Sequence, residues 1–319
     1  MKCLCCGKII TERASTEEKN SFWHKRCIKS FFNTQKLPLL DISKEQLEHL
    51  ANTTVAKGLT VPGVQKKLSL HLSQDTETRL TIVDYPTGYI LKPQTEDFDS
   101  LPEFEDLAMR MAEIAGIKTV PHALMKMNNN YVYITKRIDR NIFPGTLCLY
   151  AMEDFCQLSN RLTQDKYKGS YESCGRIIQK YSSYPGLDLS ELFMRVVFSF
   201  IIGNSDMHLK NFSLREIEPA SRIFRLSDAY DMLPVNIIMP EDTEQLALTL
   251  NGKKRNIHKK DFYLFAEKCG ISKKTSEKMI KKLCSLKEKY LAQCDESYLS
   301  NELKDRLKLL IEERINNLI

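Results

Sequence analysis

The chain has 319 residues, of which 42% are hydrophobic and 28% charged, a composition that suits a folded protein with one large domain or two lobes. A net charge of +6 fits an anionic ligand or an acidic partner and falls short of the basic excess of a dedicated nucleic-acid binder. The first residues lack the apolar stretch of a signal peptide, and the longest apolar run, 196–202, is too short to cross a bilayer. We therefore expect a cytoplasmic protein with reduced or metal-bound cysteines and no membrane association.

Two short pairs of soft ligands lie near the N-terminus, Cys3-x-x-Cys6 and His24-x-x-Cys27. This spacing is typical of a tetrahedral zinc site, and four protein ligands would make the ion structural. The alternative is a small reduced hairpin with incidental cysteines. We assign residues 1–50 to an N-terminal Cys/His-containing segment and keep a structural Zn²⁺ as an open hypothesis.

A glycine-containing turn follows the first helices. Helices are expected at 28–32 and after the N-cap candidate Ser43, with a hinge at 57–60 and a strand that alternates from Leu68 to Leu72. Backbone amides in the turn before this strand could bind phosphates, although an ordinary β-turn is the alternative. The residues of this candidate phosphate loop are Pro62, Gly63, Val64, Gln65, Lys66 and Lys67.

A lysine inside an apolar strand is the next unusual feature. Strands are expected at 80–83 and from Tyr89, and the second contains Lys92. Burying an unpaired ammonium is costly, and kinases use a strand lysine, paired with a helix glutamate, to bind nucleotide phosphates. The helix expected at 103–116 offers Glu105 as the first choice of partner and Glu103 as the second, with a solvated helix face as the alternative.

Two more alternating strands, at 120–125 and 131–139, complete a mostly antiparallel sheet with one helix. This is the outline of a kinase small lobe, to which we assign 51–152, and the mainly helical large lobe is 153–319. We thus predict an α+β, bilobal, protein-kinase-like fold. The segment 149–155 is the expected hinge, where the backbone at Glu153, Asp154 and Phe155 could pair with adenine.

The chain is organised around a polar loop that follows an apolar run at 192–202. Asp206 and Asn211 stand five residues apart, the spacing of the kinase catalytic loop. Phosphoryl transfer needs an Asp near the attacking hydroxyl, and an Asn and a second Asp on Mg²⁺; Asp231, after two short strands at 212–214 and 223–226, is the expected second Asp. His208 and Lys210 line the loop, and Lys210 could stabilise the transferring phosphoryl group. The alternative is a helix end followed by a polar turn.

The remaining segments complete the large lobe. A helix is expected at 172–181, a break at 185–186, a strand at 246–251 that ends in an Asn-Gly turn, and a helical tail at 262–319. The basic run at 253–260 is most simply a solvated face, with an acidic partner or DNA as the alternative.

These blocks together resemble the HipA-like family of serine/threonine kinases, in particular the short HipT-type toxins, from about residue 50 to 319. The matching blocks are VPGVQKKLS at 61–69, YILKP at 89–93, EDFCQ at 153–157, GNSDMHLKN at 203–211, YDML at 230–233 and LALTLNGK at 246–253.

The resemblance implies an ATP- and Mg-dependent serine/threonine protein kinase that acts as the toxin of a bacterial toxin–antitoxin system. It implies that Asp206 is the catalytic base, that Asn211 and Asp231 bind the metal, and that Lys92 binds phosphate. The family phosphorylates an aminoacyl-tRNA synthetase, which halts translation, and phosphorylates itself just before the glycine-rich loop. Thr60 is at one such position, while Gly58 stands where short members have a second hydroxyl.

The resemblance also implies partners. Short members act with a small HipS-like protein and a DNA-binding HipB-like antitoxin, so we expect this chain to contact DNA only through the antitoxin. We also expect that the chain has no room for the extra N-terminal subdomain of the longer toxins. Some short members have a similar Cys-x-x-Cys and His-x-x-Cys start, from which alone no metal is inferred. Two other functions stay open: a lipid or small-molecule kinase, because the order Asp-x-His-x-x-Asn is similar to that of phosphoinositide kinases, and a non-catalytic binding module.

Overall fold

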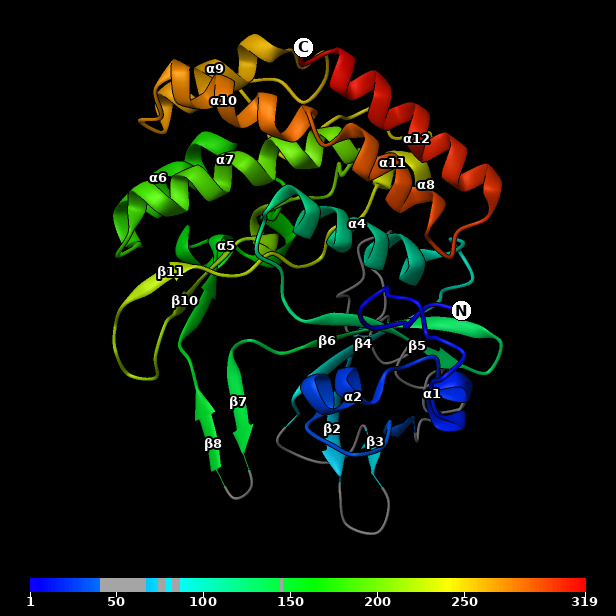
Figure 1. Cartoon of the computed structure of the whole chain (residues 1–319). Coiled ribbons are helices and arrows are strands. Elements are labelled where there is room, and N and C mark those ends of the chain that lie inside the picture. The colour runs from blue at the N-terminus through cyan, green and yellow to red at the C-terminus, as the bar shows by residue number, and fades with distance from the viewer. Residues whose placement is uncertain (41–66, 74–77, 82–86, 144–145) are drawn as a thin grey trace. The chain divides into compact units, whose positions relative to one another are not determined.

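The computed structural model describes residues 1–40, 67–73, 78–81, 87–143 and 146–319 (Figure 1). The expected helix after Ser43, the hinge with Thr60 and the loop residues 62–66 lie outside the described residues. The chain divides into two compact units. Unit 1 comprises Met1–Pro102 and Pro121–Leu147, and unit 2 comprises Glu103–Val120 and Cys148–Ile319.

Unit 1 is built on one sheet with the strand order β1-β3-β2-β4-β6-β5. The pairing of β1 with β3 is parallel and the other pairings are antiparallel. Leu68 and Leu70 are buried while Ser69 between them is exposed, as the alternating pattern indicated. The strands are β1 (Leu39–Leu40), β2 (Leu68–Ser73), β3 (Arg79–Thr81), β4 (Tyr89–Pro93), β5 (His122–Met127) and β6 (Asn130–Lys136), with a separate ribbon of β7 (Arg140–Phe143) and β8 (Thr146–Leu149).

Two short helices, α1 (Thr16–Ser21) and α2 (Lys25–Phe32), precede the sheet. Ser15 and Glu18 form a capping box that starts α1. The apolar face of α2 is buried, and the Phe32 ring lies with its centroid 5.3 Å from that of Tyr89 on β4. The core of unit 1 therefore extends from the sheet into the N-terminal segment.

Unit 2 is mainly helical and has α7 (Pro185–Ile202) at its centre, with α6, α10 and α12 packed against it (Figure 1). Every residue from Leu192 to Ile202 is buried, which is typical of a core helix. The other helices are α4 (Leu101–Ala115), which starts at the unit boundary, α5 (Phe155–Leu158), α6 (Tyr171–Tyr181), α8 (Val235–Ile238), α9 (Lys259–Lys268), α10 (Lys273–Cys284), α11 (Lys287–Asp295) and α12 (Asn301–Asn316). The short strands β9 (Met152–Asp154), β10 (Ser213–Glu216) and β11 (Phe224–Leu226) form an antiparallel sheet in the order β11-β10-β9, and η1 (Thr163–Asp165) and η2 (Leu209–Asn211) are single 3₁₀ turns.

The structure differs from the sequence expectations in three places. Pro185 starts α7 rather than breaking the chain there, because its missing N–H and fixed φ suit the first helical turn. The strand expected at 246–251 does not form: of residues 246–250, all of them described, only Thr249 and Leu250 pair, each in an isolated bridge, although the expected turn is present with left-handed Asn251 and Gly252. The helix expected in the small lobe clusters with the helical unit from Glu103 onward.

No helix within the described ranges combines the length and the apolar character that a membrane crossing needs.

Candidate active site

The polar loop begins where α7 ends in a left-handed glycine. Gly203 has φ 71°, a left-handed conformation that favours glycine, and a Cβ there would meet Cδ2 of Leu310 at 2.7 Å, so that side chain would have to shift. The buried Asn204 then accepts a hydrogen bond from the N–H of Asp206 through Oδ1, at 3.2 Å. The sequence thus turns the chain sharply out of the core and delivers Asp206.

Two backbone hydrogen bonds and one side-chain hydrogen bond fix the loop from Asp206 to Asn211. The N–H of His208 donates to the carbonyl of Asp206 at 2.8 Å, and the N–H of Asn211 donates to the carbonyl of His208 at 3.0 Å. Nδ2 of Asn211 also donates to the carbonyl of Asp206 at 3.0 Å. This bond uses the amide nitrogen, so the amide oxygen is the atom that a cation would take.

The second acidic segment, 228–231, is attached to the chain that follows α4. The N–H of Ala229 donates to the carbonyl of Lys118 at 2.7 Å, and the N–H of Val120 donates to the carbonyl of Ala229 at 3.0 Å. Asp231 has φ 62°, a left-handed conformation that is uncommon outside glycine and is enriched at functional positions.

Tyr230 connects this segment to the loop. Its hydroxyl donates to the carbonyl of Lys210 at 3.1 Å and shares a 2.5 Å hydrogen bond with Oγ of Ser213 on β10. The Tyr230 hydroxyl therefore links its own segment to Lys210 in the loop and to Ser213 on β10, and Tyr230 directly precedes Asp231. Burial raises the pKa of Tyr230 above its ordinary value, so the hydroxyl keeps its proton.

Tyr167 contacts the candidate base directly. Its hydroxyl donates a hydrogen bond to Oδ1 of Asp206, and its ring meets the His208 ring edge-on, with the centroids 5.1 Å apart. Burial raises the pKa of Tyr167 well above its ordinary value, and the negative charges of Asp206 and Asp231 raise it further. The two aspartates therefore act on the same hydroxyl. Sequence reasoning missed Tyr167, because nothing in a polar segment 39 residues upstream indicates this contact.

Lys210 is paired with an acidic side chain from β9. Its Nζ lies 2.7 Å from Oδ2 of Asp154, while Oδ1 of Asp154 caps α5 by accepting from the N–H of Gln157 at 2.9 Å. The structure thus joins two residues that the sequence assigned to different roles, a phosphoryl stabiliser and a hinge residue. The side chain of Lys210 is 33% exposed, which leaves it accessible to an anionic ligand.

Two of the backbone groups expected to contact adenine are used inside unit 2. The N–H of Asp154 donates to Oε1 of Gln157, and the N–H of Phe155 donates to the carbonyl of Phe212, both at 2.9 Å. The Phe155 side chain is fully buried and stacks on Phe212, whereas Glu153 is exposed on β9. An adenine would have to pair with other backbone groups of this segment or displace these bonds.

The expected phosphate-binding lysine is buried on β4 of unit 1. Lys92 is 3% exposed, and its Nζ lies 5.4 Å from the centroid of the Tyr133 ring. The candidate partners Glu103 and Glu105 lie on α4 and belong to unit 2, so their pairing with Lys92 stays a prediction. Burial raises the pKa of Glu103 to about 7. Lys67 is exposed at the start of β2, and the rest of the expected phosphate loop lies outside the described residues.

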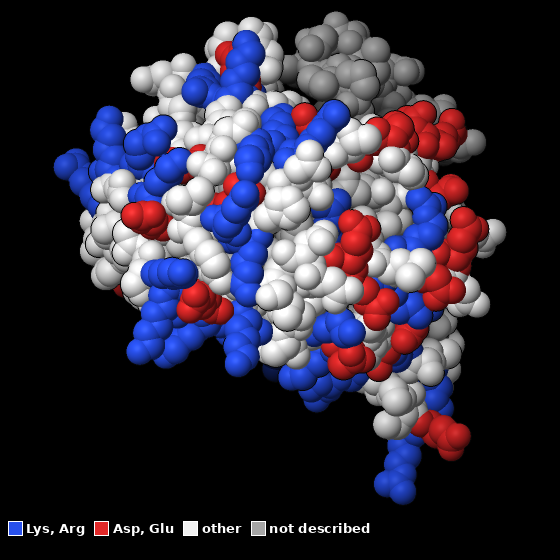
Figure 2. Space-filling model, turned by 90° about the horizontal axis from the view of Figure 1, so that it is seen from above, with Lys and Arg blue, Asp and Glu red and all other residues white. Residues whose placement is uncertain are grey.

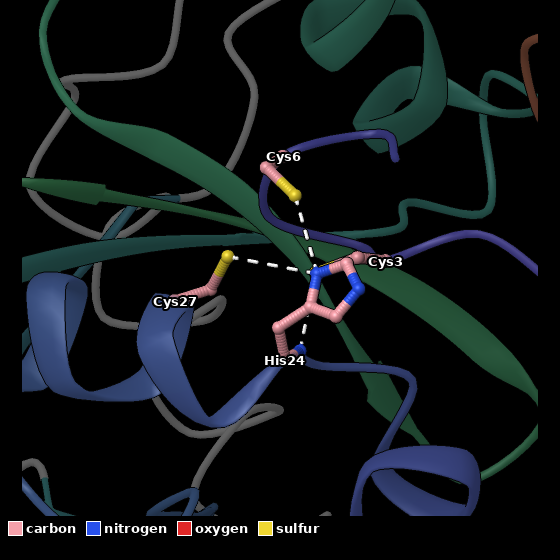
Figure 3. A group of neighbouring side chains, drawn as sticks. All are labelled: Cys3, Cys6, His24 and Cys27. Carbon is pink, nitrogen blue, oxygen red and sulfur yellow. Dashed lines mark hydrogen bonds between the residues drawn. The ribbon is translucent and has the colours of Figure 1, made fainter. Parts of the chain in front are cut away.

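The four N-terminal candidate ligands come together in unit 1 (Figure 3). One ligand atom each of Cys3, Cys6, His24 and Cys27 lies within 4.8 Å of all the others. Although burial opposes it, hydrogen bonds from the backbone of Lys8 and the side chain of His24 lower the pKa of the Cys6 thiol to about 7. Burial and the neighbouring Cys5 and Cys3 raise the pKa of the Cys27 thiol.

The basic run 253–260 is partly neutralised within unit 2. Lys253 contacts Asp261 at 2.8 Å, and Lys254 contacts Glu244 at 3.0 Å. Figure 2 looks onto the helical end of the chain and shows Lys and Arg gathered toward the α9–α10 side, with acidic side chains more frequent on the opposite side. Two lysines of the run are thus engaged in ion pairs within unit 2, and the role of the remaining basic residues stays a prediction.

Comparison with solved structures shows the class of fold. HipA in the HipA–HipB–operator DNA complex of Shewanella oneidensis MR-1 aligns with a TM-score of 0.68 at 17% identity, over 81% of this chain and 64% of that chain. The proinflammatory kinase CtkA of Helicobacter pylori aligns with a TM-score of 0.54 at 15% identity, over 79% of this chain and 93% of that chain. The chain therefore has the mixed α/β fold of HipA and CtkA.

The chain belongs to the HipA-like C-terminal domain family, whose model matches residues 59–290. Relatives in Sinorhizobium fredii are "Putative kinase Y4dM", 32% identical over 232 residues, and "Putative kinase Y4mE", 27% identical over 221 residues. Each alignment covers 67% of this chain but only 54% and 51% of those relatives, so the chain spans about half their length. A "Putative kinase" of Haemophilus influenzae is 23% identical over 258 residues, which is 73% of this chain and 74% of that one.

Proposed function

We propose that this chain is an ATP- and Mg-dependent serine/threonine protein kinase that serves as the toxin of a toxin–antitoxin system. The observation that carries the proposal is the site in unit 2. There, Asp206 and Asn211 share one hydrogen-bonded turn, and the Tyr230 hydroxyl ties the segment of Asp231 to it. Membership of the HipA-like family and the kinase names of the relatives support the same activity.

Each residue of the site has a role in this proposal. Asp206 accepts the hydrogen bond of the attacking hydroxyl and takes up its proton as transfer proceeds. The amide oxygen of Asn211 and the carboxylate of Asp231 would hold Mg²⁺, which would supply positive charge to the nucleotide phosphates. Lys92 binds nucleotide phosphate with Glu105 as its partner, and His208 contributes to the loop.

Lys210 and Asp154 form an ion pair that a nucleotide can rearrange. The Lys210 side chain is partly exposed, and its ammonium lies 2.7 Å from a carboxylate oxygen of Asp154. A phosphoryl group that approaches the loop would compete with Asp154 for this cation, because oxyanions bind an ammonium through the same charge-assisted hydrogen bonds. Lys210 then stabilises the charge of the phosphoryl group in the transition state.

We propose the substrate and the partners from the resemblance to the HipA-like family. The proposed substrate is an aminoacyl-tRNA synthetase, whose phosphorylation would stop translation, and the proposed site of self-phosphorylation is Thr60. The HipA neighbour is in a complex with HipB and operator DNA, which supports a HipB-like antitoxin as a partner of this chain, with DNA reached through it. A small HipS-like protein is the other partner that we propose for this chain.

Incubation of the purified protein with Mg-ATP, followed by mass spectrometry, tests the activity. We expect added phosphate on the wild type, and none on Asp206→Asn or in excess EDTA. Asp228→Asn is the matched control, because Asp228 lies in the acidic segment but pairs with Lys118 at 3.1 Å on the surface. Equal phosphate on the wild type and Asp206→Asn would refute the role of Asp206. Phosphate that appears only on lipid vesicles would point to a lipid kinase instead.

A further inference from the structure

The Cys/His cluster has the dimensions of a metal site. A tetrahedral zinc ion with its usual bonds to sulfur and imidazole nitrogen sets neighbouring ligand atoms roughly 3.6–3.8 Å apart. Here Sγ of Cys6 lies 3.4 Å and Sγ of Cys27 lies 3.9 Å from Nδ1 of His24, and both bonds are drawn in Figure 3. Three sulfurs and one nitrogen thus converge from one turn, at residues 3–6, and from the start of α2.

The surrounding backbone supports sulfur in the form that binds metal. The N–H of His24 donates to Sγ of Cys3 at 3.4 Å. The turn that carries both cysteines is closed by a 2.8 Å hydrogen bond from the N–H of Gly7 to the carbonyl of Cys3, with Gly7 left-handed at φ 68°. Such outer contacts orient ligands and favour the thiolate.

We propose that Cys3, Cys6 and Cys27 through Sγ, and His24 through Nδ1, bind one structural zinc ion that holds residues 1–32 against the edge of the unit 1 sheet. The inference is independent of the proposed kinase activity. Zinc is the metal that three thiolates and one imidazole at these separations suit best. Because protein atoms fill all four positions, the ion has no open coordination site for a substrate.

The contacts of β5 show what the ion would stabilise. β5 is the edge strand of the sheet, and Leu124 on it donates its N–H to the carbonyl of Leu4 at 3.1 Å. The carbonyl of Leu124 accepts from the indole N–H of Trp23 at 3.2 Å. Leu4 and Trp23 each adjoin a proposed ligand in sequence, Cys3 and His24. Fixing the ligands therefore fixes the groups that cover the edge, where unpaired backbone would invite association.

Metal content is the first test. Protein purified without added metal should contain one zinc per chain by elemental mass spectrometry, and cobalt exchange should give the visible bands of a tetrahedral thiolate complex. Cys6→Ser should weaken zinc binding by more than about 100-fold, because losing a ligand costs more than losing an outer contact. Cys5→Ser is the matched control, one residue away and outside the tetrad. Zinc-free protein, cobalt without tetrahedral bands, or a disulfide among the four residues would overturn the site.

Hydrogen exchange tests the structural role on the wild type, so it does not depend on a variant that folds. The amide of Leu124 should be protected in the zinc-loaded protein and exchange at least about 10-fold faster after chelation, since its partner Leu4 is released. Amides of β4, which is paired on both sides, serve as the internal reference. Unchanged protection of Leu124 after complete zinc removal would refute the role at the edge.

Discussion

The Cys/His cluster and the Asp206–Asp231 site are assembled in different ways. The cluster takes its side chains from residues 3–27, and each of its two pairs lies within four consecutive residues. The Asp206 site has one local pair, Asp206 and Asn211, and depends on distant segments for Asp231, Tyr167 and Asp154. In the cluster a bound ion would hold the ligands together, whereas the site is held by the buried part of α7, Leu192–Ile202, and by a set of side-chain hydrogen bonds. The two regions should therefore fail under different treatments.

The largest expected effect separates the two regions by chemistry. Asp206→Asn should lower the rate of phosphoryl transfer by about 10²–10⁴-fold, because the amide cannot take the proton of the attacking hydroxyl. The same variant should leave the zinc content and the exchange of the Leu124 amide unchanged, because the change lies in unit 2. Transfer assays and elemental mass spectrometry on one preparation measure both. A parallel loss of zinc would show that the regions are not independent.

The same difference decides what the sequence could predict. Cys3, Cys6, His24 and Cys27 were identified as a set from spacing alone, because each pair is close in sequence and a metal-ligand spacing specifies geometry. The Asp206–Asn211 pair was predicted for the same reason, and the turn that joins them is present. The contacts of Tyr167 with Asp206 and of Lys210 with Asp154 span 39 and 56 residues and follow from tertiary packing, which single-sequence spacing does not encode. The strand expected at 246–251 was wrong because a buried apolar run does not by itself specify a strand, and only Thr249 and Leu250 of this run pair, each in an isolated bridge.

Chelation and pH should act on different units. Burial raises the pKa of Glu103 in unit 2 to about 7 from 4.5. A raised folded-state pKa favours the protonated form, so its contribution to stability is complete below pH 4.5 and is lost as the pH rises through 7. The total loss should be about 3 kcal/mol, of which about 2 kcal/mol falls between pH 5.5 and pH 8.5. Thermal unfolding at pH 5.5 and 8.5 measures it.

Glu103→Gln should flatten this pH dependence, because the amide does not titrate. Glu113→Gln, an exposed position on the same helix, should keep the wild-type profile. A pH dependence that is the same in all three proteins would assign the effect to another group.

Tyr230→Phe should weaken the tie between the loop and the Asp231 segment. It removes the donor to the carbonyl of Lys210 and the bond to Oγ of Ser213. Leaving these partners unsatisfied should cost about 1–3 kcal/mol of stability. Apparent affinity for Mg-ATP should fall as Asp231 is held less firmly. Isothermal titration with Mg-ATP and chemical unfolding measure the two effects, with the exposed Tyr181→Phe as the control. Lower stability with unchanged nucleotide affinity would limit Tyr230 to a structural role.

The smallest expected effect lies at the contact that sequence reasoning missed. The Tyr167 hydroxyl donates a hydrogen bond to Asp206, and its raised pKa keeps it protonated throughout the neutral range. In Tyr167→Phe this hydrogen bond is absent, and Asp206 loses one of the contacts that orient its carboxylate. One hydrogen bond is worth about 0.5–1.5 kcal/mol, so the rate of phosphoryl transfer should fall by about 2–12-fold, far less than in Asp206→Asn.

A faster rate in Tyr167→Phe would instead mean that the phenol occupies the position of the substrate hydroxyl and must leave before transfer. Measuring kcat and KM for the protein substrate separates these two cases. Loss of an orienting contact lowers kcat in Tyr167→Phe, whereas loss of a competing hydroxyl lowers KM in Tyr167→Phe relative to the wild type.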